Sequence, residues 1–186
     1  MTLDEFLVWN PGDPRGWTWQ LIDGEPAAMA PGSHADAVIQ SEVARLLGNH
    51  LVDQRSPCHV VTEPGIVPRV GANRNYRVPD LGVTCAPPSN DPMVPEPVVL
   101  IEILSPSNEA DTRANIWAYT TVPSLREILA IRSTRVEAEL LVRDADGTWP
   151  AEPEIIGPAD AVRLASIAFS SPLSSVYRTT ALAADR

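Results

Sequence analysis

The sequence predicts a mixed α/β (α+β) domain in which a central mixed β-sheet is flanked by α-helices. Three observations predict it. Strand, helix, strand, helix and strand patterns follow one another along the chain, as in a sheet covered by helices. Residues 98–104 are nearly all apolar, as expected of a strand buried on both faces. The 186 residues, 44% hydrophobic and 20% charged, suit one folded domain over residues 1–186 and exclude a disordered or fibrous chain.

The first elements have clear local signals. Strand patterns at residues 17–22 and 25–29 flank Asp23-Gly24, a dipeptide typical of tight hairpin turns, so we predict an N-terminal β-hairpin. From Ser33 to Leu51, apolar residues recur at three- and four-residue steps, which predicts an amphipathic helix. Ser33 or Asp36 could cap its first turn.

The rest of the chain continues the alternation. Five stretches rich in apolar or β-branched residues are predicted strands: 59–67, 76–85, 98–104, 125–133 and 135–143. A second helix is expected from Asn108 to about Thr121, because Pro123 stops it. Near the end we expect a strand over 162–167 and a short helix over 171–177.

Charge and composition exclude several functions. The 24 acidic and 14 basic residues give a net charge of −10, the wrong sign for a general nucleic-acid coat, so any DNA contact must be local. All the basic residues are arginines. Because arginine stays protonated, mechanisms that need a Schiff-base or P-loop lysine are excluded.

The two cysteines and the terminus indicate the compartment. Cys58 and Cys85 form no CxxC pair, so neither a zinc knuckle nor a disulfide framework is predicted. The first residues lack a basic signal region, and the longest apolar run, 98–101, is too short to cross a bilayer. We therefore expect a cytoplasmic protein with no membrane partner.

Two acids in neighbouring predicted strands are the first candidates for chemistry. Asp80 follows Pro79 in one strand, and Glu102 lies in the middle of the next. On one face of the sheet they would offer hard oxygen ligands to Mg²⁺ or Mn²⁺, and such an ion could assist phosphodiester hydrolysis. Alternatively both acids are hydrogen-bonded structural residues. An unpaired carboxylate is costly in so apolar a strand, which favours the metal site.

Several motifs in order resemble the Uma-two family of restriction endonuclease-like proteins. They are Gln20-Leu-Ile-Asp-Gly-Glu25, Pro31-Gly-Ser-His34, Val78-Pro-Asp80, Leu100-Ile-Glu-Ile-Leu-Ser-Pro-Ser107, Asp111-x-x-x-Asn115-x-x-x-Tyr119 and Val122-Pro-Ser-Leu-Arg-Glu127. The resemblance covers about residues 17–143 and leaves 150–186 as a C-terminal extension. It implies a restriction endonuclease-like core similar to the PD-(D/E)XK nucleases, a homodimer, and Asp80 and Glu102 as ligands of Mg²⁺ or Mn²⁺.

The sequence departs from the family pattern in two respects. Gln20 stands where the family usually carries Glu; its amide could accept a hydrogen bond from a metal-bound water, and Glu25 could compensate if it points inward. The usual lysine positions fall on Leu104 and Asn115. Asn115 can orient a water but carries no charge, and losing one such donor commonly costs about 10²–10³ in rate. Asn115→Lys should therefore raise cleavage.

The remaining candidates have a functional and a structural interpretation. Asp111, Asn115 and Tyr119 share one helical stripe and would support the site, whereas Arg113 points elsewhere. His34, at the predicted helix start, could contact metal or substrate, or it could be a surface group. Arg69, Arg74 and Arg77 form the dense basic cluster near Asp80, and they could hold DNA phosphates or only solvate a loop.

Together these features predict a metal-dependent endonuclease that hydrolyses DNA phosphodiester bonds. Asp80, Glu102 and Asn115 would form a catalytic site weakened by the missing lysine. The alternative is a catalytically silent nuclease-fold protein that binds DNA or a protein partner. The hydrolytic hypothesis requires that Asp80 and Glu102 lie on one face of the sheet, and that no arginine neutralises either one.

Overall fold

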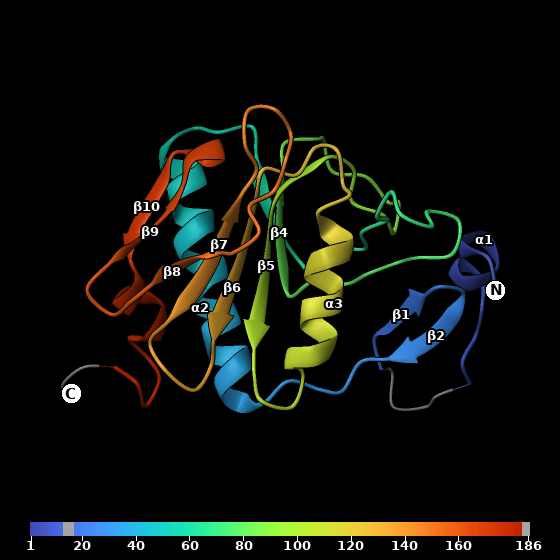
Figure 1. Cartoon of the computed structure of the whole chain (residues 1–186), viewed down its shortest axis with the longest axis horizontal. Helices are drawn as coiled ribbons and strands as arrows, with labels where there is room; N and C mark the ends of the chain where they lie inside the picture. Colours follow the sequence, from blue (N-terminus) through green and yellow to red (C-terminus); the bar gives the residue numbers. More distant parts are fainter. Residues whose placement is uncertain (13–16, 184–186) are drawn as a thin grey trace.

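A computed structural model describes residues 1–12 and 17–183 and arranges them around a six-stranded sheet (Figure 1). The strand order is β3-β4-β5-β6-β7-β8. The strands are β3 (His59–Thr62), β4 (Leu81–Thr84), β5 (Pro97–Leu104), β6 (Glu127–Arg132), β7 (Ala138–Val142) and β8 (Glu154–Ile156). β5 and β6 are parallel, and the other neighbours are antiparallel. The predicted mixed sheet is confirmed.

Two long helices cover opposite faces of this sheet: α2 (His34–Asp53) and α3 (Glu109–Tyr119). Ile101 and Ile103 of β5 pack in the cluster that contains α2, whereas Leu100 and Leu104 pack in the cluster that contains α3. β5 is therefore buried on both faces, as its apolar sequence predicts. Within the described ranges, no helix is long and apolar enough to cross a membrane.

The remaining elements lie at the two ends of the chain. They are α1 (Leu3–Leu7), β1 (Trp19–Ile22), β2 (Glu25–Ala28), β9 (Ala161–Leu164), β10 (Phe169–Pro172) and the 3₁₀ helices η1 (Ala165–Ile167) and η2 (Leu173–Tyr177). β1 and β2 form the predicted hairpin. Asp23 and Gly24 have φ of 51° and 89°, the left-handed values that a two-residue type I′ turn requires. Residues of β9, β10 and η2 join the cluster around α2.

The segment before β4 binds the hairpin rather than the sheet. The sequence predicts a strand over 76–85, yet only Leu81–Thr84 joins the central sheet. Tyr76 instead exchanges two backbone hydrogen bonds of 2.9 Å with Leu21 of β1. The backbone N–H of Ile66 donates to the carbonyl oxygen of Arg77 at 2.8 Å. The hairpin is thereby held against the segment that leads to Asp80.

Cys58 and Cys85 are joined by a disulfide, so the prediction of no disulfide is wrong. His59 of β3 pairs with Thr84 of β4. Cys58 directly precedes His59 and Cys85 directly follows Thr84, so the two cysteines lie opposite each other. Cysteine spacing alone cannot reveal a pairing that strand register creates. The expectation of a cytoplasmic protein therefore loses the support it drew from unpaired cysteines.

Reduction of the Cys58–Cys85 disulfide is expected to lower the free energy of unfolding by about 3 kcal/mol. The physical reason is that the crosslink closes a loop across a sequence separation of 27 in the unfolded chain. Urea unfolding with and without a phosphine reductant measures the difference. A Cys58→Ser/Cys85→Ser variant should match the reduced native protein, and a native protein indifferent to the reductant would contradict the expectation.

Candidate functional site

A cavity of about 230 Å³ opens between the hairpin, the start of α2, the adjacent ends of β4 and β5, and α3. Five of the predicted site residues line it: Gln20, Asp80, Glu102, Asp111 and Asn115. These residues come from four separate segments of the chain. The fold therefore brings the predicted acid pair and the predicted helical stripe to one place.

Asp80 and Glu102 meet because of strand register. Leu81 of β4 pairs with Ile101 of β5, so Asp80 is one position before and Glu102 one position after a paired couple. Residues opposite each other in an antiparallel pair project to the same face. The two carboxyl groups lie close enough that the charge of Asp80 raises the pKa of Glu102. The first condition of the hydrolytic hypothesis is met.

Two neighbouring elements fix the position of Asp80. Its Oδ2 accepts a hydrogen bond of 2.6 Å from the backbone N–H of Ile103. The side-chain amide of Gln40, on α2, donates to the backbone carbonyl of Asp80 at 2.8 Å. Asp80 is thus held by β5 and α2 at the position directly before β4.

Glu102 is held by Tyr119. The hydroxyl of Tyr119 donates to Oε1 of Glu102 at 2.8 Å, and both side chains are buried. Since Asn115 is also buried and lines the cavity, α3 presents the predicted stripe toward the acids. Asp111, one turn earlier, is exposed and lies at the cavity wall.

The electrostatic environment of the two acids favours their protonated forms. Burial raises the pKa of Glu102 well above its ordinary value, and the negative charge of Asp80 raises it further. Burial also raises the pKa of Asp80, although the N–H of Ile103 acts in the opposite direction. In residues 1–12 and 17–183, no arginine lies within ion-pair distance of either carboxylate. The second condition of the hydrolytic hypothesis is therefore met, because the acid pair has no arginine partner in this part of the chain.

Asp36 is a buried carboxylate in the cavity lining that sequence reasoning did not assign to the site. Its Oδ2 accepts a hydrogen bond of 2.7 Å from the backbone N–H of Ser33 in a capping box at the start of α2. Its buried Oδ1 has no hydrogen-bond partner in the part of the chain that the structure describes. The Ser33-x-x-Asp36 spacing predicts the cap, but only the tertiary fold places that turn at the cavity.

The other hairpin and helix-start candidates have different outcomes. Gln20 is buried at the cavity, but its Oε1 already accepts a hydrogen bond of 3.1 Å from the backbone N–H of Val78. Glu25 is exposed and is not a lining residue, so it does not compensate for the missing charge. His34 is also exposed and outside the cavity lining, in agreement with its interpretation as a surface group.

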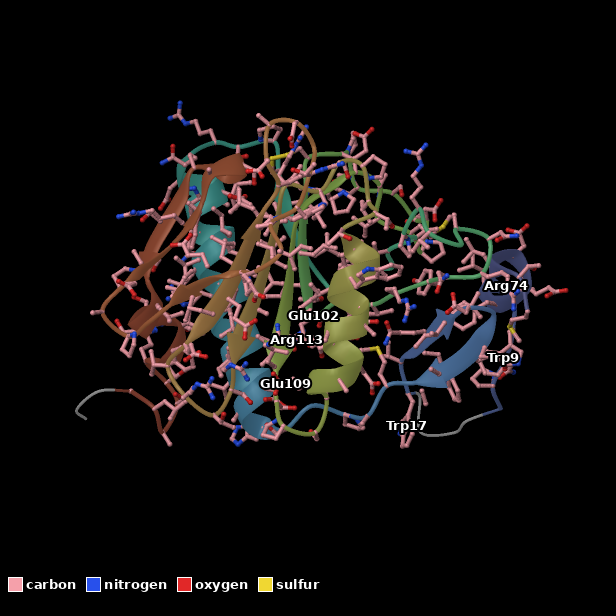
Figure 2. All side chains as sticks on the ribbon, viewed as in Figure 1. Trp9, Trp17, Arg74, Glu102, Glu109 and Arg113 are labelled. Carbon is pink, nitrogen blue, oxygen red and sulfur yellow. A yellow bond between two sulfur atoms is a disulfide. The ribbon has the colours of Figure 1, made fainter. Side chains whose placement is uncertain are left out.

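The three arginines predicted to contact DNA do not share one surface. Arg69 and Arg74 are exposed, whereas Arg77 is only 6% exposed and is not available to a phosphate at the surface. Arg74 donates to the backbone carbonyl of Asp23 at 2.6 Å and lies near α1, away from Glu102 (Figure 2). The prediction of a joint phosphate-binding cluster is therefore wrong for Arg77. The three arginines are close in sequence, but Arg77 is buried and the other two are exposed.

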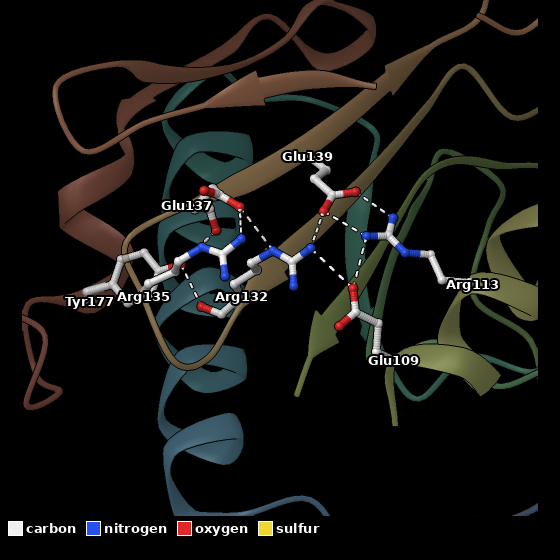
Figure 3. A network of polar contacts seen from close by, with 7 residues as sticks. All are labelled: Glu109, Arg113, Arg132, Arg135, Glu137, Glu139 and Tyr177. Atoms are coloured by element: carbon white, nitrogen blue, oxygen red, sulfur yellow. Dashed lines mark hydrogen bonds and ion pairs between the residues drawn. The ribbon is translucent and has the colours of Figure 1, made fainter. Parts of the chain in front are cut away.

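Arg113 points away from the cavity, as the helical geometry predicts. Its guanidinium pairs with Glu139 of β7, with one contact of 2.7 Å, and with Glu109 one turn earlier on α3 (Figure 3). Arg132 donates to the same Glu139 carboxylate at 2.8 Å. The hydrogen bond from Arg113 holds the pKa of Glu139 below its ordinary value. This network ties α3 to the sheet and leaves Arg113 no part in the acid pair.

A mixed sheet between two helices, with one acid in β5 and another directly before β4 in a cavity beside the second helix, defines a restriction endonuclease-like domain. The crystal structure of "a putative nuclease belonging to DUF820" from Anabaena variabilis has the same fold, with a TM-score of 0.76 at 20% identity, over 95% of this chain and 97% of that one.

Sequence comparison gives the family. Residues 3–167 match the Uma2 family, described as "Putative restriction endonuclease", and the chain belongs to this family. It is also similar to the uncharacterized protein slr1290 of Synechocystis sp., with 30% identity over 180 residues that cover 94% of this chain and 90% of the relative. The resemblance inferred from the motifs is confirmed.

Proposed function

We propose that this protein is a metal-dependent endonuclease that hydrolyses DNA phosphodiester bonds. The observation that carries the proposal is the pair formed by Asp80 and Glu102, which converge in a cavity where no arginine of the described ranges forms an ion pair with either one. Carboxylates with raised pKa values in a cavity are typical of functional sites. Membership in the Uma2 family supports the same chemistry.

The residues fit a divalent cation that keeps several of its waters. Asp80 and Glu102 would hold Mg²⁺ or Mn²⁺, since such ions bind through one or two carboxylates together with water and phosphate oxygens. In the described residues, no three acid, histidine or cysteine side chains converge on a single metal position, so Asp36 stands outside this pair. When bound, the ion supplies positive charge to the phosphate and lowers the pKa of water.

The protein's own groups would do the rest of the work. Tyr119 keeps Glu102 oriented, and the N–H of Ile103 keeps Asp80 oriented. The Oδ1 of Asp36, which has no partner among the described residues, can accept a hydrogen bond from the water that attacks the phosphorus. Asp36 would then be the group that accepts a proton from this water. Asn115 would offer its amide as a donor to a phosphate oxygen.

A second candidate function is a catalytically silent DNA- or protein-binding module. The observation that favours it is the absence of a cation at the usual lysine positions. Leu104 is a buried core residue, and Asn115 is neutral. The two hypotheses differ in whether the acid pair binds a cation.

Thermal unfolding and plasmid cleavage in Mn²⁺ distinguish them. Mn²⁺ should stabilise the native protein, by about 2.7 kcal/mol at a concentration one hundred times its Kd. Asp80→Ala and Glu102→Ala should lose both this response and cleavage, whereas Asp53→Ala, an exposed acid on α2, should keep both. A native protein that neither responds to Mn²⁺ nor cleaves plasmid would support the silent module.

A further inference from the structure

Among the described residues, Arg77 is a buried cation with no ion-pair partner. Its guanidinium donates to Oδ1 of Asn115 at 3.1 Å and to Oδ1 of Asn75 at 3.0 Å, and both acceptors are neutral amides. Its Nε has no hydrogen-bond partner within the described residues, although the side chain is only 6% exposed. Burying a charge against neutral groups costs several kcal/mol. Arginine nevertheless remains protonated in such places.

Arg77 sets the orientation of Asn115. The Oδ1 of Asn115 must face the guanidinium, because the reversed amide would oppose two N–H groups. Asn115 lines the cavity with Asp80 and Glu102, whereas Arg77 lies behind it. The NH₂ group is therefore the end of Asn115 that remains for a ligand in the cavity. A hydrogen bond from a charged donor also polarises the amide and strengthens its own donor end.

The hairpin turn holds Arg77 in place. Asn75, which accepts from Arg77, also accepts from the backbone N–H of Asp23 at 3.0 Å and donates to Oδ1 of Asp23 at 3.1 Å. Because the hairpin also pairs with Tyr76, the guanidinium is fixed from two sides. A continuous path of hydrogen bonds runs from the turn through Asn75 and Arg77 to Asn115.

We infer that Arg77 is a positioning residue that acts through Asn115 and turns its amide into a polarised donor for an anionic phosphate oxygen. Through Asn115, Arg77 thereby contributes positive charge to a site that has no lysine. The inference rests on the proposed function of the same cavity. The simpler account is that Arg77 only ties the hairpin to α3, which would affect stability and not turnover of the folded protein.

Kinetics of plasmid cleavage in Mn²⁺ separate the two accounts. Arg77→Met is expected to lower kcat by about 10- to 100-fold with little change in KM, because it removes a donor effect that matters in the transition state. The Mn²⁺-induced rise in Tm should persist, because the acid pair is intact. Arg77→Lys should restore part of kcat. Arg143→Met is the control, because Arg143 also donates to neutral oxygens, those of Gly147 and Pro123, outside the cavity.

Asn115→Asp keeps the test decisive where Arg77→Met does not fold. An aspartate would pair with Arg77 and preserve folding but present no N–H to the cavity, so we expect a comparable loss of kcat with Tm unchanged or raised. If the native protein cleaves plasmid and these variants cleave it equally well, the role of Arg77 is overturned but the proposed function is not. A native protein without Mn²⁺-dependent cleavage would overturn the proposed function and this inference together.

Discussion

Glu102→Gln is expected to stabilise the metal-free protein at neutral pH and to abolish its response to Mn²⁺. Glu102 is buried, and burial raises its pKa well above the ordinary value, so its ionised form is unfavourable in the folded chain. Glutamine has the same shape and can still accept the hydrogen bond from Tyr119. We expect a gain in the free energy of unfolding on the order of 1 kcal/mol.

The pH dependence of this gain has a defined sign. An unfolded glutamate has a pKa of about 4.3, so above that pH the unfolded chain binds fewer protons than the folded chain, in which Glu102 is still protonated. The contribution of Glu102 to stability is therefore present at low pH and is lost as the pH rises toward its folded pKa. The advantage of Glu102→Gln over the native protein should grow across that interval and then level off.

Urea unfolding in EDTA, repeated across the acid to neutral range, measures this difference. Comparison of the two proteins is essential, because the pKa of Glu139 is lowered by Arg113 and changes stability in the opposite direction. Glu154→Gln, an exposed exchange on β8, serves as the control and should show no such trend. A difference in the free energy of unfolding that does not change with pH would contradict the raised pKa of Glu102. With Mn²⁺ present, the native protein should regain stability and the variant should not.

The parts of the fold that the sequence predicts are those with strong local signals. Asp23-Gly24 predicts its hairpin because both residues tolerate the left-handed backbone of the turn. The apolar period after Ser33 predicts α2, and the apolar run of β5 predicts a central strand. Each of these signals depends on neighbours in the chain, so no knowledge of tertiary contacts is needed.

The elements that were missed depend on partners distant in sequence. Tyr76 has a strand-like sequence, yet its partner is the hairpin and not the sheet. β8 and β10 are only three and four residues long, and half of β10 is serine, so their patterns are too weak to identify. The disulfide follows the same rule, since only the register of β3 and β4 brings its two cysteines together.

The candidate site divides in the same way. Asp80 and Glu102 could be predicted because Asp80 directly precedes one conspicuous strand pattern, that of β4, and Glu102 lies in the next, and adjacent strands have few ways to pair. Asp36 could not, because its signal is that of a helix cap. Arg77 was grouped with Arg69 and Arg74 by closeness in the chain, whereas its burial against Asn115 is a tertiary property. Residues whose place at the site depends on tertiary packing alone, such as Asp36 and Arg77, are thus its least predictable part.

Asn115→Lys is expected to destabilise the native protein by roughly 3 kcal/mol, although the family resemblance alone suggests that it should repair the site. The Nη1 of Arg77 lies 3.1 Å from the Oδ1 of Asn115. A lysine there would deprive the guanidinium of an acceptor and place a second cation beside it. Attraction to Asp80 and Glu102 offsets only part of this cost, because the two cations remain close in a buried region.

A double-mutant cycle with Arg77→Met tests this expectation. Removing the guanidinium should make Asn115→Lys tolerable, so the two substitutions should couple by about 1–3 kcal/mol in urea unfolding. Plasmid cleavage in Mn²⁺ should exceed the native rate only in the double variant, in which the ammonium faces the acid pair without a competing cation. If Asn115→Lys alone is as stable as the native protein, Arg77 does not control this position. If the double variant cleaves no faster than Arg77→Met, a cation beside the acid pair is not what limits the reaction.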